Sequence, residues 1–198
     1  MVADKSIFIV KSRKGYQTRM SLVGAAFDLI ADDGVKMLTI SSICERVGLQ
    51  RSSFYTHFEN LEALLDTLVH QVLDDVGQRA QAAFDKQTDI PSLFEFRIRF
   101  LFQLAMDEPA YACLIYELYT FYPPTVARVK ARVFSDIEAA MKQGQIDITK
   151  READALKHIF VASMIDALRR LTKHDANNDQ MDQLLSLLFR ITDRTINQ

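Results

Sequence analysis

The chain has 198 residues, of which 48% are hydrophobic and 25% are charged, and its formal net charge is −2. This balance is ordinary for a globular protein and excludes a low-complexity or strongly charged disordered chain. The apolar runs are short and interrupted by charged residues, so we expect no membrane-spanning helix, no signal peptide and a cytoplasmic location. Six glycines and four prolines give few breaks, which favours an all-α fold with long helices.

The first predicted helix ends before Gly34. Apolar residues repeat in it at helical spacing, at Val23, Ala26, Phe27 and Ile30, which predicts one buried stripe. Glycine takes a left-handed conformation more freely than any other residue, so we expect Gly34 to be left-handed and to end this helix.

Two shorter helices are predicted next. Thr39 is a suitable N-cap for the first of them, and Gly48 allows a tight turn after it. Phe54 and Phe58 would anchor the second, which is too short to stand alone. Its opposite face is polar, and a helix of this kind suits the major groove of DNA. The side chains on that face are Gln50, Arg51, Ser52, Tyr55 and Thr56.

This helix-turn-helix segment resembles the DNA-binding domain of the tetracycline-repressor (TetR) family. The resemblance implies a homodimeric, all-helical transcription regulator, usually a repressor that a small ligand releases from its operator. One departure is Leu61, which stands where the family commonly has lysine, so that one phosphate contact is missing or supplied from elsewhere. The runs that carry the resemblance are Ala25–Phe27, Asp33–Gly34, Thr39–Ile40 with Ile43, Val47–Leu49, Phe54–Phe58 and Glu62–Leu65.

Basic residues concentrate toward the amino terminus. Residues 1–60 hold eight Lys or Arg against six Asp or Glu, whereas the rest of the chain holds sixteen against twenty. Lys11, Arg13, Lys14 and Arg19 have no acidic residue between them, and we expect them to meet phosphate, although a solvated terminus would show the same pattern. The predicted DNA-binding residues are Thr39, Gln50, Arg51, Ser52, Ser53, Tyr55, Thr56 and His57, with Thr39 and His57 on backbone phosphates.

The rest of the chain is predicted to be helical, which gives about nine helices in all. Residues 1–60 would form the DNA-binding domain, and residues 61–198 a larger domain for effector binding and dimerisation. Prolines, Gly144 and a capping box at Thr149–Glu152 mark the junctions. The expected later helices cover about 60–84, 91–106, 109–119, 123–142, 149–173 and 179–195.

The last two predicted helices have the pattern of a dimer interface. Each carries more apolar surface than one core can bury, so two helices from each subunit would form a four-helix bundle. A buried central helix in a monomer is the alternative. The residues predicted for the interface are Phe160, Met164, Leu184, Leu187, Leu188 and Ile191.

Aromatic side chains are dense between residues 94 and 134, and a few polar ones interrupt them. Small-ligand sites are mostly apolar with a few placed polar groups, so we expect an effector pocket here, with plain core as the alternative. Phe100 is the predicted wall, Gln103 the polar anchor and Tyr116 a third contact. Arg97 or Arg99 leaves an anionic ligand open.

The sequence predicts no enzyme, cofactor or metal site. Its four histidines lack metal-ligand spacing, and it contains no phosphate-binding glycine loop, nucleophile elbow or HExxH motif. Cys44 and Cys113 lie in apolar helical patterns, which favours buried free thiols. Two other functions remain open: a helical enzyme on a borrowed scaffold, and a helical adaptor that binds protein instead of DNA.

Overall fold

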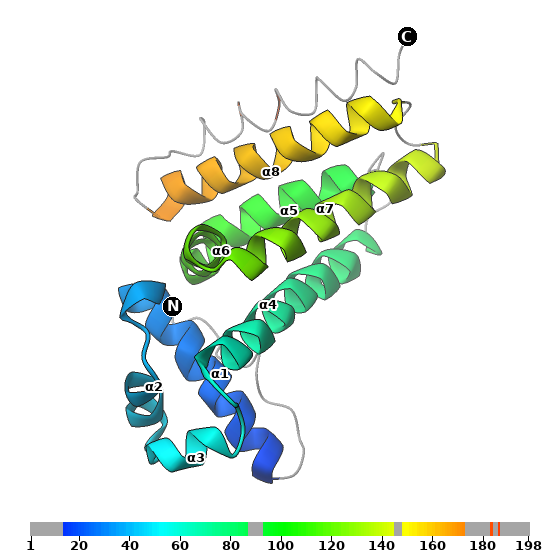
Figure 1. The fold of residues 1–198 in the computed structure, drawn as a ribbon. Coiled ribbons are helices and arrows are strands. Elements are labelled where there is room, and N and C mark those ends of the chain that lie inside the picture. Colours follow the sequence, from blue (N-terminus) through cyan, green and yellow to red (C-terminus); the bar gives the residue numbers. More distant parts are fainter. Residues whose placement is uncertain (1–13, 87–92, 145–147, 173–182, 184–185, 187–198) are drawn as a thin grey trace.

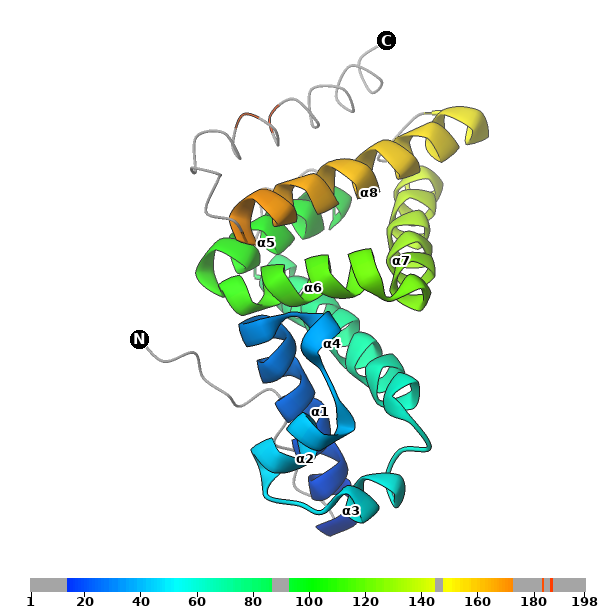
Figure 2. The ribbon, with the colours of Figure 1, turned by 60° about the vertical axis from the view of Figure 1, so that its left-hand side comes forward.

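A computed structural model describes residues 14–86, 93–144 and 148–172, together with Gln183 and Ser186. Within these ranges every regular element is helical, as the composition predicts. Figures 1 and 2 show a small group of helices at one end, a long helix leading away from it, and a larger group of helices at the other end. The elements are α1 (Lys14–Asp33), the 3-10 turn η2 (Val35–Met37), α2 (Ile40–Val47), α3 (Arg51–Tyr55), α4 (Leu61–Phe84), α5 (Leu93–Asp107), α6 (Pro109–Phe121), α7 (Pro123–Lys142) and α8 (Lys150–Thr172).

The predicted helix ends are mostly confirmed. Thr39 caps α2, because its hydroxyl accepts a hydrogen bond from the Ser42 N–H at 3.0 Å, and Gly48 ends α2 in the left-handed conformation. The capping box that begins α8 is present as well, with the Thr149 N–H donating to Glu152 Oε2 at 2.8 Å. The predicted ninth helix lies outside the described residues except for two positions, which are both helical.

Gly34 corrects one detail of the sequence interpretation. Its φ of 83° is positive, as predicted, but its ψ of 159° is not that of a left-handed helical residue. The chain is extended there and turns directly into η2, which begins at the next residue. This conformation is essentially restricted to glycine, so position 34 requires glycine even more strictly than a left-handed cap would.

One hydrophobic core joins the two groups of helices. The α1 stripe is buried, with Val23, Ala26 and Ile30 each 0% exposed. The same cluster of buried side chains continues through α4 and α6 and reaches Leu168 in α8. Along the described part of the chain, no helix is both long and apolar enough to cross a membrane. Because they share this core, the small group of helices and the larger group are packed as one body.

Helix α6 makes a second connection to the small domain, beside the covalent one through α4. It packs on α1 and η2 on one side and on α8 on the other, and Figure 2 shows it lying across the end of α1. The Val35 N–H donates to Glu117 Oε2 at 3.0 Å, and the Lys36 ammonium lies 4.1 Å from the centre of the Phe121 ring. The end of α1 is thus held by polar contacts as well as by packing.

Candidate nucleic-acid interface

Helix α3 has only five residues and is held by aromatic side chains on one side. Phe54 is 0% exposed and Phe58 is 2% exposed, and their ring centres lie 5.7 Å apart. Tyr55 packs edge-on against Phe54 but keeps 54% of its surface exposed. The buried rings replace the stability that so short a helix lacks, and they fix which face points outward.

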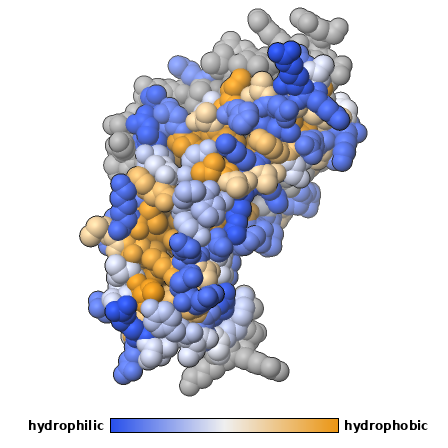
Figure 3. Space-filling view, viewed as in Figure 1, coloured by the Kyte–Doolittle hydropathy of each residue, from blue (hydrophilic) through white to orange (hydrophobic). Residues whose placement is uncertain are grey.

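The outward face of α3 is polar, as the sequence predicts. Arg51 and Tyr55 stand one turn apart on it, where both can reach a base edge or a phosphate. The hydroxyl of Thr56 donates to the Ser53 carbonyl at 2.7 Å. Figure 3 shows hydrophilic residues at the lower end of this face of the molecule, where α3 lies. Of the predicted contacts, the structure exposes Gln50, Arg51, Ser52, Tyr55 and Thr56, and leaves Ser53 and His57 half-buried.

Thr39 lies at the exposed amino end of α2. Its hydroxyl accepts from the Ser42 N–H and also contacts the Ser42 hydroxyl at 3.0 Å. The amino end of a helix carries a partial positive charge, which favours a phosphate there. The position of Thr39 agrees with a phosphate contact, although its main role in the structure is to cap α2.

Leu61 makes a packing contact at the position where the resemblance leads one to expect lysine. It is the first residue of α4, is half-buried, and packs against the hydrophobic core. Its neighbour Asn60 caps the helix, accepting from the Ala63 N–H at 2.8 Å. This position therefore contributes packing and has no charge to offer a phosphate.

Arg19 departs from the predicted basic cluster. Its side chain is half-buried and donates to the His57 carbonyl and, at 3.0 Å, to Thr67 Oγ1. The expectation that it meets phosphate is not supported by this geometry. Lys11 and Arg13 lie outside the described residues.

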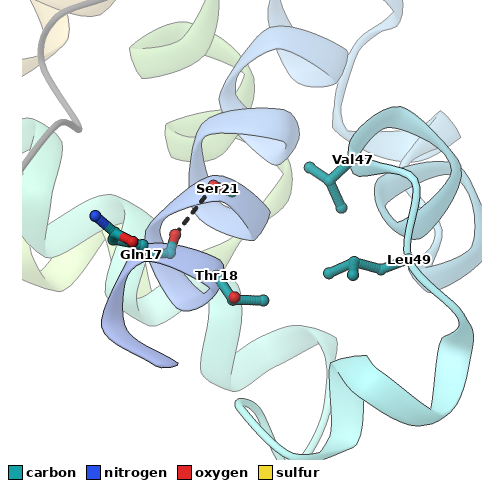
Figure 4. A pocket seen from close by; sticks show the side chains of 5 residues that line it. All are labelled: Gln17, Thr18, Ser21, Val47 and Leu49. Carbon is teal, nitrogen blue, oxygen red and sulfur yellow. Dashed lines mark hydrogen bonds between the residues drawn. The ribbon is translucent and has the colours of Figure 1, made fainter. Parts of the chain in front are cut away.

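A shallow hollow of about 180 Å³ adjoins the start of α3. As Figure 4 shows, polar residues of α1 line one side of it, and Val47 at the end of α2 and Leu49 of the following turn line the other. Its volume is below the roughly 300 Å³ of typical small-ligand sites. The hollow is therefore better suited to contact with a nucleic-acid backbone than to binding an effector. The α1 residues are Gln17, Thr18 and Ser21, which the sequence interpretation missed although they share one helical face.

The predicted effector residues differ in their exposure to solvent. Phe100 is half-buried and stacks on Phe96, with ring centres 6.1 Å apart, and Tyr116 packs against the core. Gln103 is exposed and donates to Asp107 at 3.0 Å within its own helix. Its role as a polar anchor stays a prediction that this geometry does not favour.

Thr125 of α7 is a polar side chain that the sequence interpretation missed. It is only 3% exposed, and its hydroxyl has no hydrogen-bond partner among the residues that the structure describes. A buried hydroxyl without a partner is destabilising by about 1–3 kcal/mol, so a residue of this kind is a candidate contact for the ligand that the sequence predicts in the larger domain. No sequence pattern distinguishes it, because its burial results from packing against distant helices.

The predicted dimer residues are only partly described. Met164 packs against the core of its own chain, and the backbone of Phe160 lies within α8. Ile159 is 52% exposed on the outer side of α8, with the exposed Ala155 and Ala162 one turn away on either side. The other four predicted interface residues lie outside the described residues: Leu184, Leu187, Leu188 and Ile191.

The described residues contain no group of three or more His, Cys, Asp or Glu that could hold a metal ion. The two cysteines are free, as predicted; Cys44 is 2% exposed and Cys113 is half-buried. Burial raises the pKa of both thiols, so that neither is poised as a nucleophile. The exposed polar face of α3 is therefore the most developed site of the described chain.

Comparison with known sequences points to the same face. Residues 22–68 match the tetR family of bacterial regulatory proteins. The tetracycline repressor protein class A from transposon 1721 of Escherichia coli is 42% identical over 53 residues, which are 27% of this chain and 24% of the repressor. The matching residues cover about a quarter of the length of this repressor and of the class C tetracycline repressor from the same organism.

Solved structures extend the similarity to the whole fold. A TetR-family transcriptional regulator from Pectobacterium atrosepticum aligns with a TM-score of 0.66 at 20% identity, covering 93% of this chain and 97% of that one. RolR in complex with its ligand resorcinol aligns with a TM-score of 0.63 at 20% identity, covering 90% and 89%. At such identities the likeness shows a shared fold.

Proposed function

We propose that this chain is a DNA-binding transcription regulator of the TetR family, most simply a repressor that a small-molecule effector releases. Residues 22–68 match the family, and the fold is that of TetR-family regulators of known structure. The observation that carries the proposal is helix α3, with its buried aromatic side and exposed polar side. Since the proposed target is operator DNA, the proposed location is the cytoplasm.

In the proposed complex, α3 enters the major groove. Arg51 and Tyr55 contact base edges or phosphates, and the amino end of α2 at Thr39 holds a backbone phosphate. The hollow beside α3 lies next to the same surface and offers Gln17 and Thr18 as further backbone contacts. Residues 1–60 are the proposed DNA-binding domain, and residues 61–198 the proposed effector and dimerisation domain.

The proposed active form is a homodimer. Two recognition helices must stand about one turn of DNA apart to read two half-sites, which a pair of chains related by a two-fold axis provides. The exposed side of α8 around Ile159 supports this, since an isoleucine that is 52% exposed gains from a partner surface. The apolar stripe at Leu184, Leu187, Leu188 and Ile191 would complete the four-helix bundle.

The proposed effector binds in the larger domain and weakens DNA binding. It must bind one arrangement of the dimer more tightly than another, because equal binding would shift nothing. That RolR, with the same fold, binds resorcinol supports a small aromatic ligand. Phe100 and Tyr116 are proposed wall residues. The buried hydroxyl of Thr125, which has no partner among the described residues, is proposed as the polar anchor in place of the exposed Gln103.

Selection from a random DNA library tests this proposal. The unmodified protein is expected to enrich a duplex with two related half-sites. Replacing Arg51 by alanine should weaken binding of that duplex by about 1–3 kcal/mol if the guanidinium reads a guanine edge. A library without enrichment, or full binding after both Arg51→Ala and Tyr55→Ala, would favour the adaptor or enzyme alternative.

A further inference from the structure

Arg19 of α1 lies where α1, the end of α3 and the start of α4 meet. Figure 1 shows the first half of α1 beside α3 and the start of α4. Its guanidinium donates to the His57 carbonyl, just beyond α3, and to the Thr67 hydroxyl of α4 at 3.0 Å. We propose that Arg19 is a positioning residue that sets the orientation of the reading helix relative to α1 and α4, and is not itself a phosphate ligand.

The contact with α3 is both polar and aromatic. Helix α3 ends at Tyr55, and a cation near the carboxyl end of a helix interacts favourably with its free carbonyls. The guanidinium carbon also lies 3.9 Å from the centre of the Phe58 ring. Phe58 packs on Phe54, and Phe54 packs on the exposed Tyr55. Arg19 thus reaches the reading surface through three rings in sequence.

The contact with α4 gives the same side chain a second fixed point. Thr67 accepts from Arg19 and donates its own proton to the Ala63 carbonyl at 2.9 Å, which holds the hydroxyl in one orientation. Because the guanidinium is planar and rigid, its two bonds fix the end of α3 against the first turns of α4. Lysine has one flexible ammonium and cannot hold both partners in the same way.

Salt dependence separates positioning from phosphate contact. A side chain that neutralises a phosphate contributes about one unit to the slope of log affinity against log salt, for specific and non-specific DNA alike. A residue that orients α3 affects only the sequence-specific contacts, so its loss lowers specific binding and leaves the slope unchanged. Both Nη1 and Nη2 of Arg19 already have partners within the protein, which favours positioning over phosphate contact.

The experiment uses the full-length protein, the duplex enriched above and a scrambled duplex of equal length. Arg19→Gln is expected to lower affinity for the enriched duplex about tenfold, with no change for the scrambled duplex or in the salt slope. Arg19→Lys should restore only part of this loss, although it restores the whole charge. Thr67→Val should weaken specific binding in the same direction and add little to Arg19→Gln, since both act on one contact. Arg132→Gln, which removes one positive charge from α7, is the matched control.

Three results would overturn the inference while the proposed function, on which it rests, still holds. The first is a slope reduced by about one unit with both duplexes weakened equally, which would make Arg19 a phosphate ligand. The second is full specific binding by Arg19→Gln. The third is a loss on both duplexes in proportion to unfolded protein, which would make its role one of stability alone. If Arg19→Gln does not fold, Arg19→Lys and Thr67→Val decide between the same outcomes. A library without an enriched duplex would instead overturn the proposed function itself, and the inference with it.

Discussion

Replacing Gly34 by alanine tests the junction between the two domains. At φ 83° and ψ 159°, residue 34 occupies a region that only glycine enters readily, and forcing another residue into it costs about 1–3 kcal/mol. The added Cβ would also lie 3.0 Å from Glu117 Oε2, so that the carboxylate must move. Against this, alanine reduces the entropy of the unfolded chain, which returns about 0.4–1 kcal/mol. We expect a net loss of about 2 kcal/mol.

The partner of this junction is tested by replacing Glu117. Alanine would leave the Val35 N–H without its acceptor, at a cost of about 1–3 kcal/mol, whereas glutamine keeps an acceptor and should lose less. In the Glu117→Ala background, Gly34→Ala no longer meets a carboxylate, so its cost should fall to that of the backbone strain alone. Glu45→Gln, on the exposed side of α2, is a matched control expected to stay within about 0.5 kcal/mol.

Urea unfolding followed by circular dichroism at fixed protein concentration measures these differences, and thermal unfolding should show Gly34→Ala shifted down by about 4–8 °C. A loss below about 0.5 kcal/mol for Gly34→Ala would refute the extended positive-φ geometry, since ordinary backbone accepts alanine without strain. Strict additivity of the two substitutions would refute the contact between the glycine and the carboxylate.

Four other expectations concern the rest of the chain. Thr125→Val should raise the unfolding temperature slightly or leave it unchanged, because the hydroxyl it removes has no partner among the described residues; a clear drop would contradict this. A thiol reagent at pH 8 should modify Cys44 and Cys113 slowly in the native protein and fast in denaturant, since burial raises the pKa of both; fast native modification would contradict this burial. Burial and the hydrogen bond to the Asp66 carboxylate raise the pKa of Tyr122 to about 12. The folded state therefore holds this proton more tightly than the unfolded state, and the free energy of unfolding should fall as pH rises above about 10. Ionisation of Tyr122 at its ordinary pKa, followed by absorbance at 295 nm, would contradict this. Ile159→Asp should weaken self-association measured by light scattering, whereas an unchanged mass would place the interface elsewhere.

The small domain could be predicted from sequence because its signals are local. Thr39, Gly48 and Phe54 each determine structure within a few residues of themselves, through a cap, a turn and an anchor. Together they predict the exposed face of α3. Thr149 and Glu152 predict the start of α8 in the same local way, through their capping box. Local patterns predict the positive φ of Gly34, but they do not predict whether its backbone is helical or extended. The prediction of a left-handed conformation is therefore wrong in ψ.

The remaining site residues depend on contacts between distant parts of the chain. Arg19 was grouped with the basic residues near it in sequence, but its partners lie 38 and 48 residues further on. Gln103 was chosen because it shares a helical face with Phe100, yet the packing of α5 leaves it in solvent. Thr125 is buried by helices that no spacing rule brings together. Such positions need the tertiary structure before their roles can be assigned.

The continuous core has a consequence for how this protein can be divided. Side chains of α1, α4, α6 and α8 share one cluster that passes from the small group of helices into the larger one. A fragment cut after residue 60 would leave the buried side of α1 facing water, so it should not keep its shape alone. A chimaera that joins these first helices to the larger domain of another protein would have a poorly packed interface unless α4 and α6 are transferred as well. The part of the chain that can be exchanged as a unit is therefore larger than the sequence motif, and it extends to α6, the helix that carries Glu117.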